Sequence, residues 1–301
     1  MFTKMLIPLD GSRTAEKVLP YARAIGGFLK IPVELLAVVD IGEMALHITA
    51  SKARYLDTMV DDAHRSSGEY LKGISAKATG VNIKWTVEKG RPEDVIIEKA
   101  SADKNALIAM ATHGRSGVNR WLLGSIAEKV LRGSENPLLL VRGGDELEAG
   151  EKVALNSVIV PLDGSELAEK VLPFVATLAK EMNLEVILFR AYGIPYSVYS
   201  GADGYAAVDF DKLMAGVRDE AVEYLEKKSE EVKKQGVKKV SYVTKEGMSA
   251  DEIIALGRAT PDNLIAMCSH GRSGVKRWML GSVTETVVRH SGEPVLVVRA
   301  S

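Results

Sequence analysis

The stretch ATHGRSGVNRWLLGS runs from Ala111 to Ser125, and CSHGRSGVKRWMLGS runs from Cys268 to Ser282. Eleven of the fifteen aligned positions are identical. Each copy follows a short apolar run and is punctuated by glycines, which is typical of a loop between a buried strand and a helix. A chain that carries this stretch twice has been duplicated, so the fold of one copy predicts the fold of the other.

The duplication extends far beyond this loop. KMLIPLDGSRTAEKVLPYA (Lys4–Ala22) returns as SVIVPLDGSELAEKVLPFV (Ser157–Val175), 153 residues later. The glycine loops and the closing NPLLLVR and EPVLVVR stretches are 157 residues apart, which predicts a four-residue insertion in the second copy, placed here within residues 192–210. The repeats predict two domains, residues 1–143 and 157–301, joined by a polar linker at 144–156.

Apolar periodicity within the first copy predicts alternating strands and helices. Strands are expected at residues 4–9, 33–39, 81–90, 107–111 and 138–141, and helices at 14–30, 43–78, 92–100 and 120–132. Pro20 is expected to kink the first of these helices or to fall within its first turns. The alternation predicts an α/β fold with two doubly wound domains, each a five-stranded parallel sheet with helices on both faces. The strand that alternates Val81, Ile83, Trp85 and Val87 is expected near a sheet edge.

Composition excludes several classes of protein. Lys and Arg total 39 against 40 Asp and Glu, so no basic excess points to nucleic acid as the main partner. The single cysteine, Cys268, permits no disulfide within the chain and fits a reducing compartment. No signal-peptide pattern and no uninterrupted apolar run of membrane-spanning length is present, which predicts a cytoplasmic protein without a membrane partner.

The repeated loop has the composition of a phosphate-binding site. It leaves the carboxyl end of a strand and enters a helix, where backbone N–H groups and the helix dipole attract anions. Neither G-x-x-x-x-G-K-[ST] nor a G-x-G-x-x-G following a strand occurs, which excludes a P-loop and a dinucleotide fingerprint. A purely structural loop, in which the glycines serve only to turn the chain, remains an alternative.

These motifs resemble those of the universal stress protein family, whose nucleotide loop reads G-x2-G-x9-G-[ST] after a first strand that ends in P-x-D-x-S. Nine residues separate Gly114 from Gly124-Ser125, and nine separate Gly271 from Gly281-Ser282. The family's first-strand signature is matched by PLDGS in both copies. The resemblance covers both halves, so the chain looks like a tandem universal stress protein.

The resemblance implies a sheet order of 3-2-1-4-5 and a site for ATP, ADP or AMP in each half, with Mg²⁺ or Mn²⁺ accompanying the phosphates. The implied nucleotide-binding residues of the first copy are Pro8, Leu9, Asp10, Val38, Ala111, His113, Gly114, Arg115, Gly117, Gly124, Ser125 and Ile126. Those of the second copy are Pro161, Leu162, Asp163, Ala191, Cys268, His270, Gly271, Arg272, Gly274, Gly281, Ser282 and Val283. No catalytic residue and no metal site built from protein alone is expected.

The family also pairs single domains through their last strands, which implies that Leu138–Val141 and Val295–Val298 face each other as a pseudo-dimer within the chain. A further homodimer is left open. The function expected from these features is an adenine-nucleotide-binding regulatory protein of the stress response with little or no turnover.

Several alternatives stay open at this stage. Ala111 and Cys268 stand where the family has its first motif glycine, and a Cβ is harmless there only if φ is negative. A nucleotide-independent interaction or scaffold protein with degenerate pockets, and a slow ATPase, are therefore alternative functions. Asp10 and Asp163 can be mere turn residues. His113 and His270 are interpreted as structural or weak ligands, and Cys268 as a buried small hydrophobe.

Overall fold

The structure is a computed structural model that describes residues 2–46, 55–77, 81–112, 123–142, 153–193, 209–271 and 280–299. The strands are β1 (Lys4–Pro8), β2 (Val33–Val39), β3 (Ile83–Lys89), β4 (Ala106–Ala111), β5 (Leu138–Val141), β6 (Ser157–Pro161), β7 (Glu185–Tyr192), β8 (Lys239–Glu246), β9 (Asn263–Cys268) and β10 (Val295–Val298). The helices are α1 (Arg13–Glu16), α2 (Leu19–Leu29), α3 (Ile41–Leu46), α4 (Leu56–Lys77), α5 (Pro92–Ser101), α6 (Ser125–Gly133), α7 (Glu166–Glu169), α8 (Leu172–Met182), α10 (Phe210–Lys234), α11 (Ser249–Ala259) and α12 (Ser282–His290).

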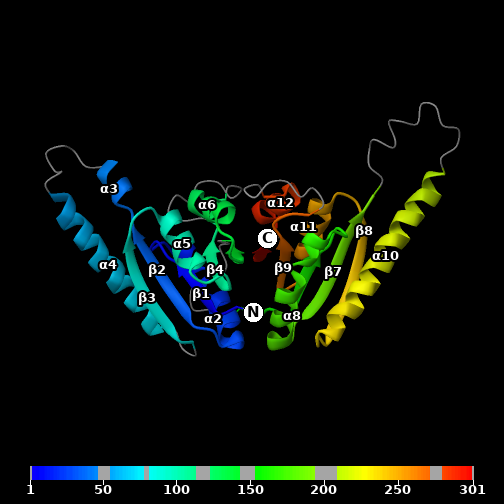
Figure 1. Ribbon diagram of the computed structural model, residues 1–301, viewed down its shortest axis with the longest axis horizontal. Coiled ribbons are helices and arrows are strands. Elements are labelled where there is room, and N and C mark those ends of the chain that lie inside the picture. The colour runs from blue at the N-terminus through cyan, green and yellow to red at the C-terminus, as the bar shows by residue number, and fades with distance from the viewer. Residues whose placement is uncertain are drawn as a thin grey trace.

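All ten strands form one sheet in the order β3-β2-β1-β4-β5-β10-β9-β6-β7-β8. Each half is parallel and has the order 3-2-1-4-5, so the predicted fold class is confirmed. The halves join where β5 pairs antiparallel with β10 and Leu139 lies opposite Leu296. Figure 1 shows the halves side by side, with α4 and α10 at the two outer ends.

Helices cover both faces of this sheet, because successive strand residues point to opposite faces. Met5 and Ile7 pack under the face that carries α1, α2 and α4 and their counterparts α7, α8 and α10. Leu6 packs under the other face, with α5, α6, α11 and α12. Each face has one apolar layer that includes residues of both halves. The predicted edge strand, β3, lies at one end of the sheet.

The helix expected over residues 14–30 is two helices, α1 and α2. Pro20 falls in the first turn of α2. Its ring would clash with the carbonyl of Glu16, four residues earlier, which is the residue where α1 ends. The second half breaks at the same place, with Pro173 in the first turn of α8. Proline therefore separates the two helices in each half.

The extra residues of the second half do not all lie where the sequence offsets placed them. Tyr70 and Tyr224 make the same hydrogen bond to a glutamate and are 154 residues apart. The carbonyls of Leu36 and Phe189 accept equivalent hydrogen bonds, from the N–H groups of Leu9 and Leu162. Leu36 and Phe189 are 153 residues apart. One extra residue therefore precedes Tyr224 and three follow it. The prediction of a single insertion at 192–210 is wrong, because α10 has 25 residues against 22 in α4 and is extended at its carboxyl end.

Charged side chains cross the junction between the halves above β5 and β10. Arg132 of α6 lies 3.4 Å from Glu285, and Arg289 of α12 lies 3.5 Å from Glu128. Arg299, which follows β10, donates to the carbonyl oxygens of Leu131, at 2.8 Å, and of Arg132 and Ser134 at the end of α6. A guanidinium from the second half thus caps a helix of the first.

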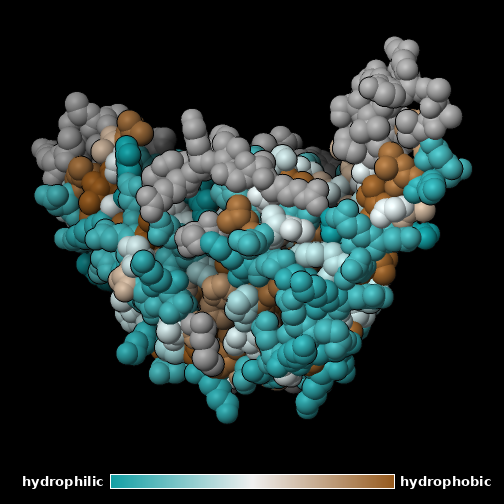
Figure 2. All heavy atoms as spheres, turned by 45° about the vertical axis from the view of Figure 1, so that its right-hand side comes forward, coloured by the Kyte–Doolittle hydropathy of each residue, from teal (hydrophilic) through white to brown (hydrophobic). Residues whose placement is uncertain are grey.

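The outer ends of the molecule expose apolar side chains. Leu46 at the end of α3 is 85% exposed, and Met59 in α4 and Leu213 in α10 are partly exposed. Figure 2 shows hydrophobic atoms gathered at these upper outer ends, next to a largely hydrophilic surface. Within the described part of the chain, no helix has both the length and the apolar character needed to cross a membrane.

Replacing the capping arginine tests how strongly the halves depend on each other. Arg299→Met keeps the apolar stem but leaves three carbonyl oxygens without their charged donor, and should lower the free energy of unfolding by about 2–3 kcal/mol. The matched control is Arg65→Met, whose ion pair with Asp62 is exposed and should contribute less than about 0.5 kcal/mol. Urea unfolding measures both, and equal losses would contradict the assignment.

A half-buried carboxyl just before β10 should make stability depend on pH. Burial raises the pKa of Glu293; nearby Asp262 adds to this rise, and Arg258 opposes it. The folded protein then holds this proton more tightly than the unfolded chain, so stability falls as pH rises through the folded pKa. Glu293→Gln, which cannot ionise, should raise the melting temperature relative to wild type at pH 7 but not at pH 4. An equal change at both pH values would contradict this prediction.

Candidate functional site

The first element of the site is the turn after β1 and its copy after β6. Asp163 Oδ1 accepts the backbone N–H of Ser165 at 2.9 Å and the Ser165 hydroxyl at 2.6 Å. Ser165 Oγ in turn accepts the N–H of Ala168 and caps α7. Asp10 makes the same backbone contact in the first half, at 2.9 Å. The intervening glycine has a φ of +80° at Gly11, a conformation that favours glycine.

The interpretation of Asp163 as a turn residue is therefore correct for its Oδ1 atom, while Oδ2 faces Gly271. A Cβ built on Gly271 would lie only 2.2 Å from Asp163 Oδ2. Gly271 follows β9, which pairs with β6 at the centre of the second half. The aspartate of the first strand and the loop glycine after the fourth thus meet at the carboxyl edge of the sheet, where the strand order reverses. We call this place the second site, and its counterpart at Asp10 the first site.

The two ends of each repeated loop are tied together. The N–H of Gly281 donates to the carbonyl of Ser269 at 2.8 Å, and the N–H of Gly124 donates to that of Thr112 at 2.5 Å. Thr284 also donates its hydroxyl to the carbonyl of Cys268 at 2.9 Å. The loop therefore starts and finishes at the carboxyl end of β4 or β9.

The helix after the closed loop begins later in the sequence than predicted. The prediction of a helix from residue 120 is wrong at Leu123 and Gly124, because Gly124 has a ψ of 142° and α6 begins at Ser125. Gly281 has the same extended backbone before α12. Among the residues that the structure describes, no side chain caps the first N–H groups of either helix. Those groups and the helix dipole are what an anion would meet at this place.

Cys268 is the last residue of β9 and is paired in register with Val298. It is 4% exposed and packs in the apolar layer beneath α7 and α8. Burial raises the pKa of its thiol to about 12, so it is an unreactive small hydrophobe, as the sequence predicted. Neither Cys268 nor Ala111 is among the described non-glycine residues with positive φ. The backbone therefore tolerates a Cβ at the position where the family has glycine.

His270 lies between Ser269 and Gly271 at the second site. Its Nδ1 is 3.0 Å from the hydroxyl of Ser269. Its Nε2 is buried, with no hydrogen-bond partner in the described part of the chain. Burial and the positive charge of Arg299 lower the pKa of His270, so its ring is neutral at pH 7. Nε2 is therefore available for contact with a ligand, while the lowered pKa makes this ring a weaker base than an ordinary histidine.

Several predicted residues lie on the same sheet edge in less direct positions. Val38 and Ala191 stand near the ends of β2 and β7 and pack against the layer below α5 and α11. The two aspartate turns are preceded by Pro8 and Leu9 in the first half and by Pro161 and Leu162 in the second. The first turns of α6 and α12 contain Ile126 and Val283. The other predicted site residues lie outside the part of the chain that the structure describes: His113, Gly114, Arg115, Gly117, Arg272 and Gly274.

A group of polar and charged residues next to the second site was not predicted from the sequence. Arg190 in β7, Tyr224 in α10 and Glu169 in α7 form one connected group. The signal that could have indicated it is the EYL triplet shared by both halves, at Glu69–Leu71 and Glu223–Leu225.

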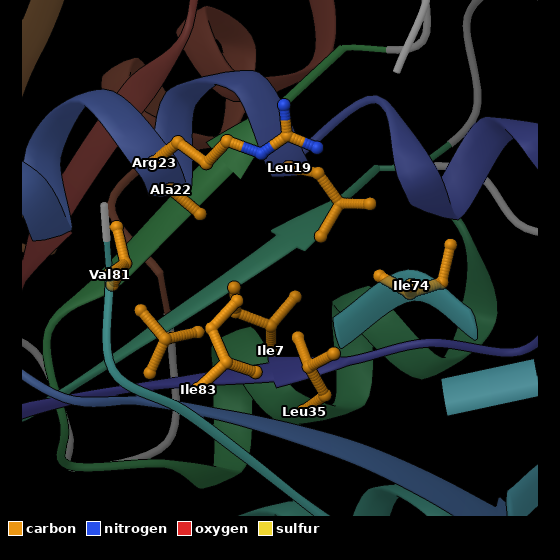
Figure 3. Close-up of a pocket in the computed structure, with 9 residues that line it drawn as sticks. Ile7, Leu19, Ala22, Arg23, Leu35, Ile74, Val81 and Ile83 are labelled. Carbon is orange, nitrogen blue, oxygen red and sulfur yellow. The ribbon is translucent and has the colours of Figure 1, made fainter. Parts of the chain in front are cut away.

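An apolar crevice also occurs in the first half, away from the candidate sites. Leu19 and Ala22 of α2, Ile74 of α4 and residues near the start of β2 and β3 line it. Figure 3 shows the side chain of Arg23 extending along one side of this crevice, next to Ala22 and Leu19. It lies toward the amino ends of β2 and β3, the opposite edge from Asp10, so it is not part of the nucleotide site inferred from the loops.

Comparison with known proteins identifies the family. The universal stress protein family model matches residues 1–142 and again residues 155–299. A universal stress protein of Bacillus subtilis is 31% identical over 147 residues, which cover 48% of this chain and 99% of that protein. One from Mycobacterium bovis is 20% identical over 307 residues and covers 99% of this chain and 97% of its own.

A solved structure extends the likeness to the fold of the whole chain. The universal stress protein of Archaeoglobus fulgidus superimposes with a TM-score of 0.71 at 24% identity, covering 99% of this chain and 98% of that one. Its coverage includes both halves and their junction. With the family model matched twice along the sequence, this chain belongs to the universal stress protein family and carries that family's domain in tandem.

Proposed function

We propose that each half binds an adenine nucleotide, ATP or its products ADP and AMP, and that the chain is a stress-response regulator with little turnover. The observation that carries this proposal is the approach of Gly271 to the Asp163 carboxylate, which leaves no room for a side chain. A glycine with so little space suits a loop whose backbone must come close to a ligand. The starts of α6 and α12, which no described side chain caps, offer N–H groups for the phosphates.

A divalent cation would be held through the nucleotide. Among the described residues, no three His, Cys, Asp or Glu side chains gather in a group that could hold a metal ion. Mg²⁺ commonly binds to substrate phosphates with few protein ligands, which fits this arrangement. A slow ATPase is less favoured, because the lowered pKa of His270 weakens it as a general base and no acidic side chain is bonded to its ring in the described part of the chain.

A scaffold protein with degenerate pockets is the second candidate, and the replacement of the first motif glycine by Ala111 and Cys268 favours it. The extended backbone at these positions argues against it, because each side chain belongs to a regular strand end. We also propose the division into domains at 1–143 and 157–301 with a linker at 144–156, forming a pseudo-dimer through β5 and β10. A cytoplasmic location and a homodimer remain predictions.

Nucleotide binding can be tested at the glycine that carries the proposal. Isothermal titration of the wild-type chain with Mg-ATP should show binding that AMP competes for. Gly271→Ala places a methyl group against Asp163 Oδ2 and should weaken binding at the second site at least tenfold. Gly216→Ala in α10, where a Cβ meets nothing within 4 Å, is the matched control and should bind as wild type. No heat with wild-type protein would refute the proposal.

The two candidate functions differ in what they predict for the affinity of Cys268→Gly. If Cys268 degrades the pocket, as the scaffold alternative assumes, glycine should raise the affinity for nucleotide; if the pocket is intact, the affinity should hardly change. Because this side chain packs in the core, Cys268→Gly should cost about 1–2 kcal/mol of stability through lost packing and added chain entropy. Nucleotide affinity, measured by the same titration, should change less than about twofold. A large gain in affinity would show instead that the side chain obstructs the nucleotide.

A further inference from the structure

Both halves tie their long helix to the candidate site by the same contact. The Tyr70 hydroxyl of α4 donates to Glu16 at 3.0 Å, and the Tyr224 hydroxyl of α10 donates to Glu169 at 2.8 Å. Each glutamate lies in the short helix that follows the site aspartate. The position of the long helix is therefore coupled to the aspartate turn in each half.

The second half adds a buried cation to this arrangement. Arg190 of β7 occupies the position of Ala37 in β2, because Phe189 and Leu36, just before them, make equivalent backbone bonds. The guanidinium donates to Glu220 Oε1 at 3.1 Å, and its central carbon lies 4.9 Å from the centroid of the Tyr224 ring. The Arg190 side chain is only 10% exposed, whereas that of Glu220 is 71% exposed.

Arg190 lies beside the second site. The carbonyl of Phe189 accepts the N–H of Leu162, the residue just before Asp163, at 2.8 Å. Arg190 is the next residue of β7, and Ala191 follows it. Burial and the hydrogen bond to Glu169 raise the pKa of Tyr224; Arg190 opposes this rise and Asp163 adds to it. The tyrosine thus lies within electrostatic reach of both the cation and the site aspartate.

We propose that Arg190 is a positioning residue that makes the second site bind adenine nucleotide more tightly than the first. This inference rests on the proposed nucleotide binding. Arg190 fixes α10 and Tyr224 against β7 beside Asp163, which reduces the ordering that ligand binding requires. Its exposed partner, Glu220, accepts the hydrogen bond that orients the guanidinium, so the pair holds α10 against β7 as one unit.

The test is a site-resolved titration of the full chain with Mg-ATP. Asp10→Asn removes the carboxylate charge of the first site and keeps its turn, so the nucleotide binding that remains is that of the second site. Asp163→Asn removes the charge of the second site, so the binding that remains is that of the first. Arg190→Met should weaken binding about tenfold in the Asp10→Asn background and change it less than twofold in the other. Arg190→Lys, which keeps a cation near Tyr224, should recover at least half of the loss on a logarithmic scale.

Thermal unfolding of each variant separates positioning from loss of fold. If Arg190→Met is unfolded, Glu220→Gln replaces it, since this exposed carboxylate can be neutralised without disturbing the core, and it should weaken the second site at least threefold. A change below twofold at the second site, or an equal loss at both sites, would overturn the proposal. Wild-type protein that binds no Mg-ATP would instead refute the nucleotide function itself.

Discussion

The antiparallel pairing of β5 with β10 is the constraint on which the rest of the molecule depends. Both strands are almost fully buried, and each is the last strand of its half. Apart from each other, they would present two apolar edges with unpaired backbone groups to water. Their pairing brings α6 beside α12, allows Arg299 to cap a helix of the other half, and makes each apolar layer continuous. The halves are therefore joined by backbone, core and charge together.

Within each half, the strand order decides which residues can form a site. Only a sheet with β6 beside β9 brings the turn after the first strand next to the loop after the fourth. At that point the Asp163 carboxylate has two functions, because Oδ1 closes the turn and Oδ2 faces Gly271. A turn residue and a site residue are thus not alternatives here. The turn holds the carboxylate in the orientation that the loop glycine meets.

The strands and the aspartate turns could be predicted from sequence because apolar runs and Asp-Gly-Ser leave little local choice. The break near Pro20 could also be predicted, because proline disrupts a helix at that point. The start of α6 at Ser125 could not be placed, since apolar spacing continued through that boundary. The extension of α10 was missed because no motif shared by the two halves lies at its carboxyl end to fix the register, although Val232 is buried there. The pairing of β5 with β10 came from family resemblance, as no residue pattern specifies which edges meet. Arg190 and Glu220 are 30 residues apart and meet only once strand and helix are packed.

A tandem chain can change one site without changing the other, which a homodimer of identical domains cannot do. Ala37 is 5% exposed within the apolar layer of the first half, so an arginine there would be a buried charge in need of a partner. The position equivalent to Glu220 is Ser66, which offers no charge. Arg190 and Glu220 are therefore useful only together, and the second half has both. The common Tyr–Glu contact remains in each half, so the added pair modifies a site whose basic architecture the two halves share.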